Sequence, residues 1–74
     1  MTALRDSIGA MRTAHALLAL GFIDAASTTL LDNRPTVEPV LAAQMAHVAK
    51  AANDDPEAAK ELLRAALQKW EEEA

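Results

Sequence analysis

The chain lacks cysteine and tyrosine, and among its 74 residues it has only one phenylalanine, one tryptophan and two glycines. Without cysteine it can form neither disulfides nor thiolate metal sites. Nothing in the sequence then indicates an oxidising compartment, so we expect a cytoplasmic protein. A chain of this length makes one small domain, which we assign to residues 1–74. Its stability must come from regular helix packing or from a partner.

Basic residues are also scarce, and they are spread singly along the chain. Seven Lys and Arg stand against eleven Asp and Glu, which gives a formal net charge of −4. Nucleic acids and anionic membrane surfaces are bound by clustered basic residues, so both partners are disfavoured. No apolar run approaches the ~20 residues of a membrane-spanning helix, and the start of the chain does not have the pattern of a signal peptide.

The chain is instead rich in alanine and leucine, and apolar residues make up 51% of it. Alanine and leucine are the strongest helix formers. The β-branched residues are few and scattered, and no stretch alternates between apolar and polar residues with the period of a strand. The sequence therefore predicts an all-α fold.

The most apolar stretch covers residues 14–31 (AHALLALGFIDAASTTLL) and is interrupted in its middle by Gly21. From residue 4 into this stretch, apolar residues recur alternately four and three positions apart, which predicts a helix from Thr2 or Ala3 to Leu20. The predicted core stripe of this helix consists of Leu4, Ile8, Met11, His15, Leu18 and Phe22.

Gly21 is the expected end of this first helix, because glycine is the usual residue where a helix ends in a left-handed conformation. A second helix should then run from Phe22 or Ile23 to Asp32. Its apolar positions are Ile23, Ala26, Ser27, Leu30 and Leu31. One kinked helix through Gly21 is the open alternative, since a glycine inside a helix costs only ~1 kcal/mol relative to alanine. That alternative would give three helices instead of four.

Residues 33–36 (NRPT) form the first clear break, because the proline disfavours a helical conformation in the residue before it. Thr36 is a good N-cap for a third helix, with Pro39 in its first turn. We expect this helix to end at about Ala51 or Ala52. Its apolar stripe consists of Val37, Leu41, Met45, Val48 and Ala52, widened by Val40 and Ala43.

Residues 53–57 (NDDPE) form the second break. Asp55 as N-cap with Pro56 at the first helical position is a strong helix start, so the fourth helix should run from Pro56 to Glu73. Its apolar face consists of Ala59, Leu62, Leu63, Ala66, Leu67 and Trp70. Acidic residues are unfavourable at a helix C-terminus, and we therefore expect the stretch 71–73 to fray.

Together these elements predict four helices in two antiparallel hairpins, with corners at Gly21 and at residues 53–55. The hairpins can form either a tetratricopeptide-like arrangement or a compact four-helix bundle.

Two segments carry a resemblance to the tetratricopeptide family. Residues 20–26 (LGFIDAA) resemble the turn between the two helices of such a repeat, and residues 54–63 (DDPEAAKELL) resemble the start of its second helix. Each helix pair is close to the 34-residue repeat length. Small proteins of this type include co-chaperones of type III secretion needle subunits. The resemblance thus implies stacked hairpins and a chaperone role toward another protein.

The sequence shows no motif of an enzyme or of a cofactor site. The serines and threonines lack a nucleophile context, the two glycines are too isolated for a phosphate loop, and the carboxylates fall at helix starts and on polar faces. His15 and His47 are the only histidines; across a bundle they could meet and, with Asp24 or Glu38, bind Zn²⁺. Packing or capping is the favoured interpretation of both histidines. We predict a protein that is not an enzyme, with no cofactor and no metal.

The second half of the first helix is apolar over most of its circumference, which a domain this small can hardly cover. An exposed apolar surface marks a protein contact. The candidate partner-binding residues are Leu17, Leu20, Phe22, Leu31 and Trp70. For Trp70 two roles are open, closing the end of the bundle or anchoring a partner.

These observations predict a non-catalytic protein-binding module that lays apolar helix faces against a helix of another protein. An adaptor, a small chaperone and an inhibitor are the roles that fit it. The alternative is a structural homo-oligomer in which the same face pairs with itself. A metal-binding or catalytic protein built on His15 and His47 is the third hypothesis.

Overall fold

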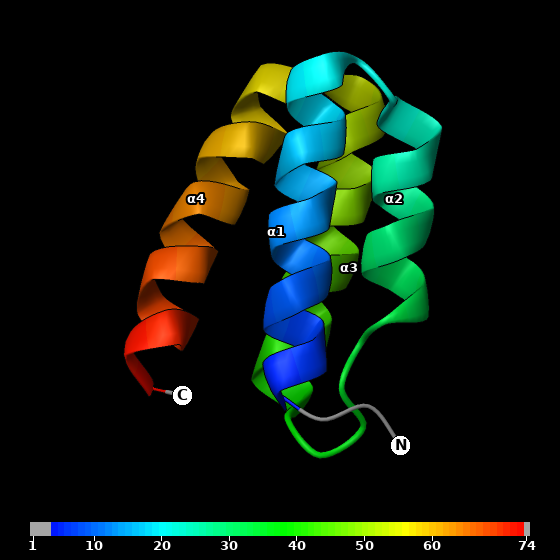
Figure 1. Cartoon of the computed structure of the whole chain (residues 1–74). Helices are drawn as coiled ribbons and strands as arrows, with labels where there is room; N and C mark the ends of the chain where they lie inside the picture. Colours follow the sequence, from blue (N-terminus) through cyan, green and yellow to red (C-terminus); the bar gives the residue numbers. More distant parts are fainter. Residues whose placement is uncertain (1–3, 74) are drawn as a thin grey trace.

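The computed structural model describes residues 4–73 and contains four α-helices in this part of the chain (Figure 1). The helices are α1 (Leu4–Leu20), α2 (Ile23–Asp32), α3 (Pro39–Asp54) and α4 (Pro56–Glu73). Residues 4–73 contain no β-strand. The all-α prediction with four helices is therefore confirmed, while the predicted start of the first helix at Thr2 or Ala3 lies outside the described residues.

Gly21 separates α1 from α2, as the sequence predicted. Its φ angle is +87°, in the left-handed region. The Gly21 N–H donates to the carbonyl of Leu18 (3.1 Å), and the Phe22 N–H donates to the carbonyl of Leu17 (2.9 Å). These two bonds form a Schellman motif, which satisfies the last carbonyls of a helix and ends it. The alternative of one kinked helix through Gly21 is thereby wrong.

The predicted N-cap at Thr36 is wrong, because α3 begins only at Pro39. Glu38 is the N-cap residue, with φ −131° and ψ 84° and no capping hydrogen bond from its side chain. A proline pushes the residue before it out of the helical region, so the helix cannot extend back through Glu38. Val37 consequently lies in the loop with 62% of its surface exposed, and not on the core stripe. At its other end α3 continues to Asp54.

The corner between α3 and α4 is a single residue, Asp55. Its carboxylate accepts a hydrogen bond from the backbone N–H of Ala58 (3.2 Å), and Pro56 takes the first helical position. This confirms the predicted N-cap and the predicted helix start. The acidic end of α4, for which we expected fraying, is helical to Glu73. Arg12 of α1 forms an ion pair there with Glu71.

The four helices close into a ring of antiparallel neighbours. Helix α1 packs against α2 and α4, and α3 packs against the same two helices. Successive helices run up and down, so both short corners lie at one end and the α2–α3 loop lies at the other (Figure 1). The result is a compact four-helix arrangement in which every helix has two neighbours.

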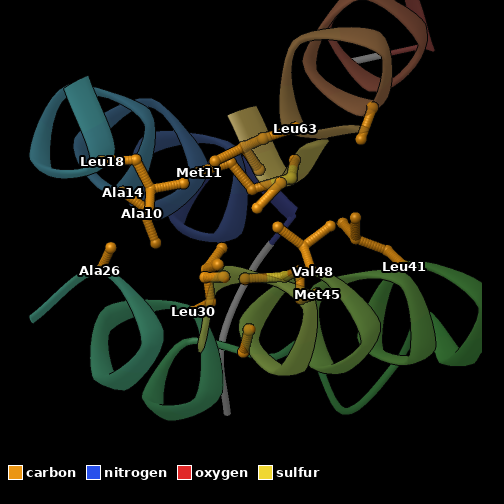
Figure 2. Packing of buried hydrophobic residues seen from close by; sticks show 14 of the residues in the cluster. Ala10, Met11, Ala14, Leu18, Ala26, Leu30, Leu41, Met45, Val48 and Leu63 are labelled. Atoms are coloured by element: carbon orange, nitrogen blue, oxygen red, sulfur yellow. The ribbon is translucent and has the colours of Figure 1, made fainter. Parts of the chain in front are cut away.

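The core lies along the axis of this ring, with side chains from all four helices (Figure 2). The large apolar side chains with less than 2% exposure are Met11, Leu30, Leu41, Met45 and Leu63. Several fully buried alanines lie between them and allow the helices to approach closely: Ala14, Ala26, Ala52 and Ala59. Among the described residues Ser7 is the buried polar side chain, and its hydroxyl donates to the Asn33 carbonyl (2.8 Å), which ties α1 to the end of α2.

Candidate protein-binding groove

The structure separates the five predicted partner-binding residues. Leu20 and Phe22 are 70% and 57% exposed, and both lie at the corner between α1 and α2. Leu31, near the end of α2, is 40% exposed, whereas Leu17 is half-buried and packs against the core. Placing Phe22 on the core stripe of the first helix was wrong, because Gly21 ends α1 and the helical spacing does not continue through it.

Trp70 is buried and closes the bundle between α3 and α4. Only 4% of its surface is exposed, and its indole N–H donates to the side-chain carbonyl oxygen of Gln44 (2.6 Å). The ammonium of Lys69 lies 5.3 Å from the centre of the indole ring, a cation–π distance. A side chain held in this way cannot anchor a partner without leaving the core, so Trp70 does not belong to the exposed surface.

An apolar groove lies between α3 and α4, on the outside of the bundle. Its volume is about 700 Å³. We call it the α3–α4 groove, and its lining residues are Pro39, Val40, Ala43, Gln44, His47, Val48, Leu62, Ala65, Ala66 and Lys69. The groove brings together side chains that are far apart in the sequence, because the residues from α3 precede the corner at Asp55 and the residues from α4 follow it.

Two parallel stripes build the groove. On α3 the lining positions Val40, Ala43 and His47 repeat three and four residues apart, and on α4 Leu62, Ala65 and Lys69 do the same. Such spacing places each set on one face of its helix.

The groove has large apolar side chains at its edges and small residues along its middle. Val40 is 55% exposed and Leu62 is 42% exposed, whereas Val48 and Ala66 are buried and form the floor. Alanines at positions 43 and 65 leave the space between the two helices open. This shape can accept the side chains of another polypeptide, and filling it would remove exposed apolar surface from water.

The α3–α4 groove carries little charge. Among the described residues that line it, Lys69 is the single one with a formal charge, and Gln44 and His47 are the other polar ones. Within residues 4–73, no carboxylate lines the groove beside His47. The groove can therefore bind an apolar surface.

The two histidines lie in different hollows. His47 lines the α3–α4 groove, while His15 lines a smaller hollow of about 320 Å³ between α1 and α4. The Nε2 atom of His15 is buried without a hydrogen-bond partner. Within residues 4–73 no group of three or more His, Asp or Glu side chains is arranged to hold a metal ion. The zinc site considered from the sequence therefore has no counterpart in the described part of the chain.

The sequence predicted the wrong role for the two residues that edge the groove. Val40 and Leu62 were both assigned to core stripes, because each follows the helical spacing of buried neighbours. The feature of the sequence that could have indicated the groove is the width of these apolar stripes. Val40 beside Leu41, and Leu62 beside Leu63, make each apolar stripe wider than two neighbouring helices can cover. The outer residue of each pair, Val40 or Leu62, therefore faces away from the core.

None of the helices in the stretch 4–73 combines the length and apolar character needed to cross a membrane. No protein family, curated protein or solved structure matches the chain significantly. The resemblance to tetratricopeptide hairpins stays a prediction, and the functional interpretation depends on the geometry of the groove.

Proposed function

We propose that this protein is a non-catalytic binding module that holds an amphipathic helix of another protein in the α3–α4 groove. The observation that carries the proposal is the groove itself, about 700 Å³ of mainly apolar space with Val40 and Leu62 exposed at its edges. Grooves between two helices are a common binding site for the apolar face of a third helix. An adaptor, a small chaperone or an inhibitor, acting in the cytoplasm, fits this mode of binding.

The length of the groove sets the size of the segment that it can hold. Val40 and His47 are seven residues apart on α3, which corresponds to roughly 10 Å along the helix axis. A docked helix therefore presents about two turns, with anchor side chains at positions i, i+3 or i+4, and i+7. Alanines at 43 and 65 provide room for these anchors between the edges.

The magnitude of the apolar contact predicts weak affinity for the groove alone. Two or three anchors of leucine size supply roughly 3–9 kcal/mol when they are fully buried. Association of two molecules costs about 4–15 kcal/mol in lost freedom of motion. Even the most favourable combination of these figures leaves only about 5 kcal/mol, so we expect dissociation constants on the order of 0.2 mM or weaker, unless the partner also contacts surfaces outside the groove.

Selection from a phage-displayed library of amphipathic helices tests this proposal. The folded protein is the target of the selection, and the affinity of the selected helices is then measured for two matched variants. Leu62→Glu places a carboxylate at the edge of the groove, and Leu31→Glu makes the same change on α2 at a similar exposure (42% and 40%).

We expect selected helices that bind the wild type and the Leu31→Glu variant but lose at least about tenfold in affinity for Leu62→Glu. Circular dichroism of both variants verifies that they are folded. The proposal is wrong if no helix is selected, or if the selected helices bind all three proteins equally well.

A further inference from the structure

The corner between α1 and α2 carries a second apolar surface, which the proposed function does not use. We call residues 20–22 the corner knob. Leu20 and Phe22 are both more than half exposed, and the hydrogen bonds from the N–H groups of Gly21 and Phe22 back to α1 fix the backbone between them. Two large apolar side chains are thus presented on a fixed turn, and docking them requires no additional ordering of the main chain.

The charges around the corner knob complement those of the α3–α4 groove. Residues 13–23 contain no Asp, Glu, Lys or Arg, and the first charged residue after the knob is Asp24, which is exposed in the first turn of α2. The groove carries the opposite sign of charge, since Lys69 is the single formally charged residue among the described residues that line it. The apolar pair Leu20 and Phe22, followed by the Asp24 carboxylate, is therefore complementary to the apolar α3–α4 groove with its Lys69 ammonium.

We propose that the corner knob of one copy of this chain docks in the α3–α4 groove of a second copy. Leu20 and Phe22 then cover Val40 and Leu62, and Asp24 lies beside Lys69. This inference rests on the proposed function, because it uses the same groove as a binding site. A second copy occupies the groove when no partner helix is present.

This contact pairs two different surfaces, so it is heterologous and not a symmetric pairing of one face with itself. The knob and the groove belong to different helix pairs of one folded domain, so a knob reaches only the groove of another copy. Each copy keeps one free surface after the first contact, and the assembly grows with concentration until it closes into a ring. A partner helix that occupies the groove competes with this growth.

Analytical ultracentrifugation of two variants and of their mixture tests the inference. Leu20→Glu disables the knob and leaves the groove intact, whereas Leu62→Glu disables the groove and leaves the knob intact. Both leucines are at least 42% exposed, so we expect both variants to fold, and circular dichroism verifies this. Leu31→Glu is the matched control outside both surfaces.

We expect the mass of the wild type and of Leu31→Glu to rise with concentration, while each of the other variants stays monomeric. Their dissociation constants should increase about 30-fold or more, as for a central contact residue. An equimolar mixture of the two inactive variants should form a dimer that does not grow, because one intact knob then meets one intact groove. Neutralising either Asp24 or Lys69 should weaken this affinity by roughly 1.5- to 5-fold, whereas exchanging the two charges should largely preserve it.

Three outcomes would overturn the inference: a wild type that stays monomeric up to millimolar concentration, a Leu20→Glu variant that still associates, or a mixture that stays monomeric. The second outcome would indicate symmetric pairing of the groove face. If the wild type stays monomeric but still binds a selected helix, and Leu62→Glu weakens that binding, only this inference is refuted and the proposed function stands. If such a helix is also lacking, the proposed function fails as well.

Discussion

Replacing each of the two glycines by alanine should change the stability of the bundle in opposite directions. Gly9 lies within α1, and Gly21 lies at the corner with a φ angle of +87°. A Cβ atom added at either position meets nothing within 4 Å. The two substitutions therefore add the same methyl group without a clash at either site, and they differ mainly in the backbone conformation that the new residue must adopt.

The expected magnitudes follow from that difference. Alanine restricts the unfolded chain and suits a helix, so Gly9→Ala should stabilise the protein by about 0.5–1 kcal/mol. At Gly21 the same gain is offset by the cost of a left-handed conformation, roughly 1–2 kcal/mol for a residue with a Cβ atom. Gly21→Ala should therefore destabilise the protein by about 1 kcal/mol. The gap between the two variants measures the left-handed strain, because the effect on the unfolded chain is similar in both.

Urea unfolding followed by circular dichroism gives both free energies of unfolding, and Gly21→Asn is a useful control. Asparagine tolerates the left-handed region better than alanine, so its loss should be smaller. In thermal unfolding each 1 kcal/mol corresponds to a shift of about 4–8 °C for a domain of this size. If Gly21→Ala stabilises the protein as much as Gly9→Ala does, the corner is not left-handed in solution, and α1 and α2 form one helix.

Three further substitutions test the packing and the caps, each by the same urea unfolding. Trp70→Ala should cost about 3–5 kcal/mol, because it empties a buried site and removes the bond to Gln44; a loss below 1 kcal/mol would mean that the indole is not buried. Ser7→Ala should cost about 1–3 kcal/mol, since it leaves the Asn33 carbonyl without its donor, and a neutral result would contradict that bond. Asp55→Ala should cost about 1 kcal/mol through loss of the N-cap of α4, whereas Asp55→Asn should restore most of it.

The helices and their ends were largely predictable from the sequence, because local residue types determine them. Gly21 ends α1, and Asp55 followed by Pro56 starts α4, at the predicted positions. In each case one residue supplies a backbone conformation or a capping group that few others can supply. The start of α3 was predicted wrongly, because the capping preference of Thr36 was given more weight than the restriction that Pro39 places on the residue before it.

The candidate site was much less predictable, because it depends on which helices become neighbours. Spacing along one helix identifies an apolar face but does not say how much of that face another helix covers. Leu63 is fully buried while its neighbour Leu62 is 42% exposed, although both belong to the same apolar face in the sequence. Trp70 lies on that face as well, and its indole N–H donates to Gln44 of α3, a partner that no pattern within α4 indicates.

The central claim, that the α3–α4 groove binds an amphipathic helix, is tested most directly by a nuclear magnetic resonance titration. The ¹⁵N-labelled protein, at a concentration at which it is monomeric, is titrated with the tightest helix from the selection. We expect the largest amide shift changes at Ala43, Ala65 and Lys69, which line the groove, and little change at Thr28, exposed on α2. Largest changes at the α1–α2 corner, or changes of equal size over all four helices, would contradict the claim.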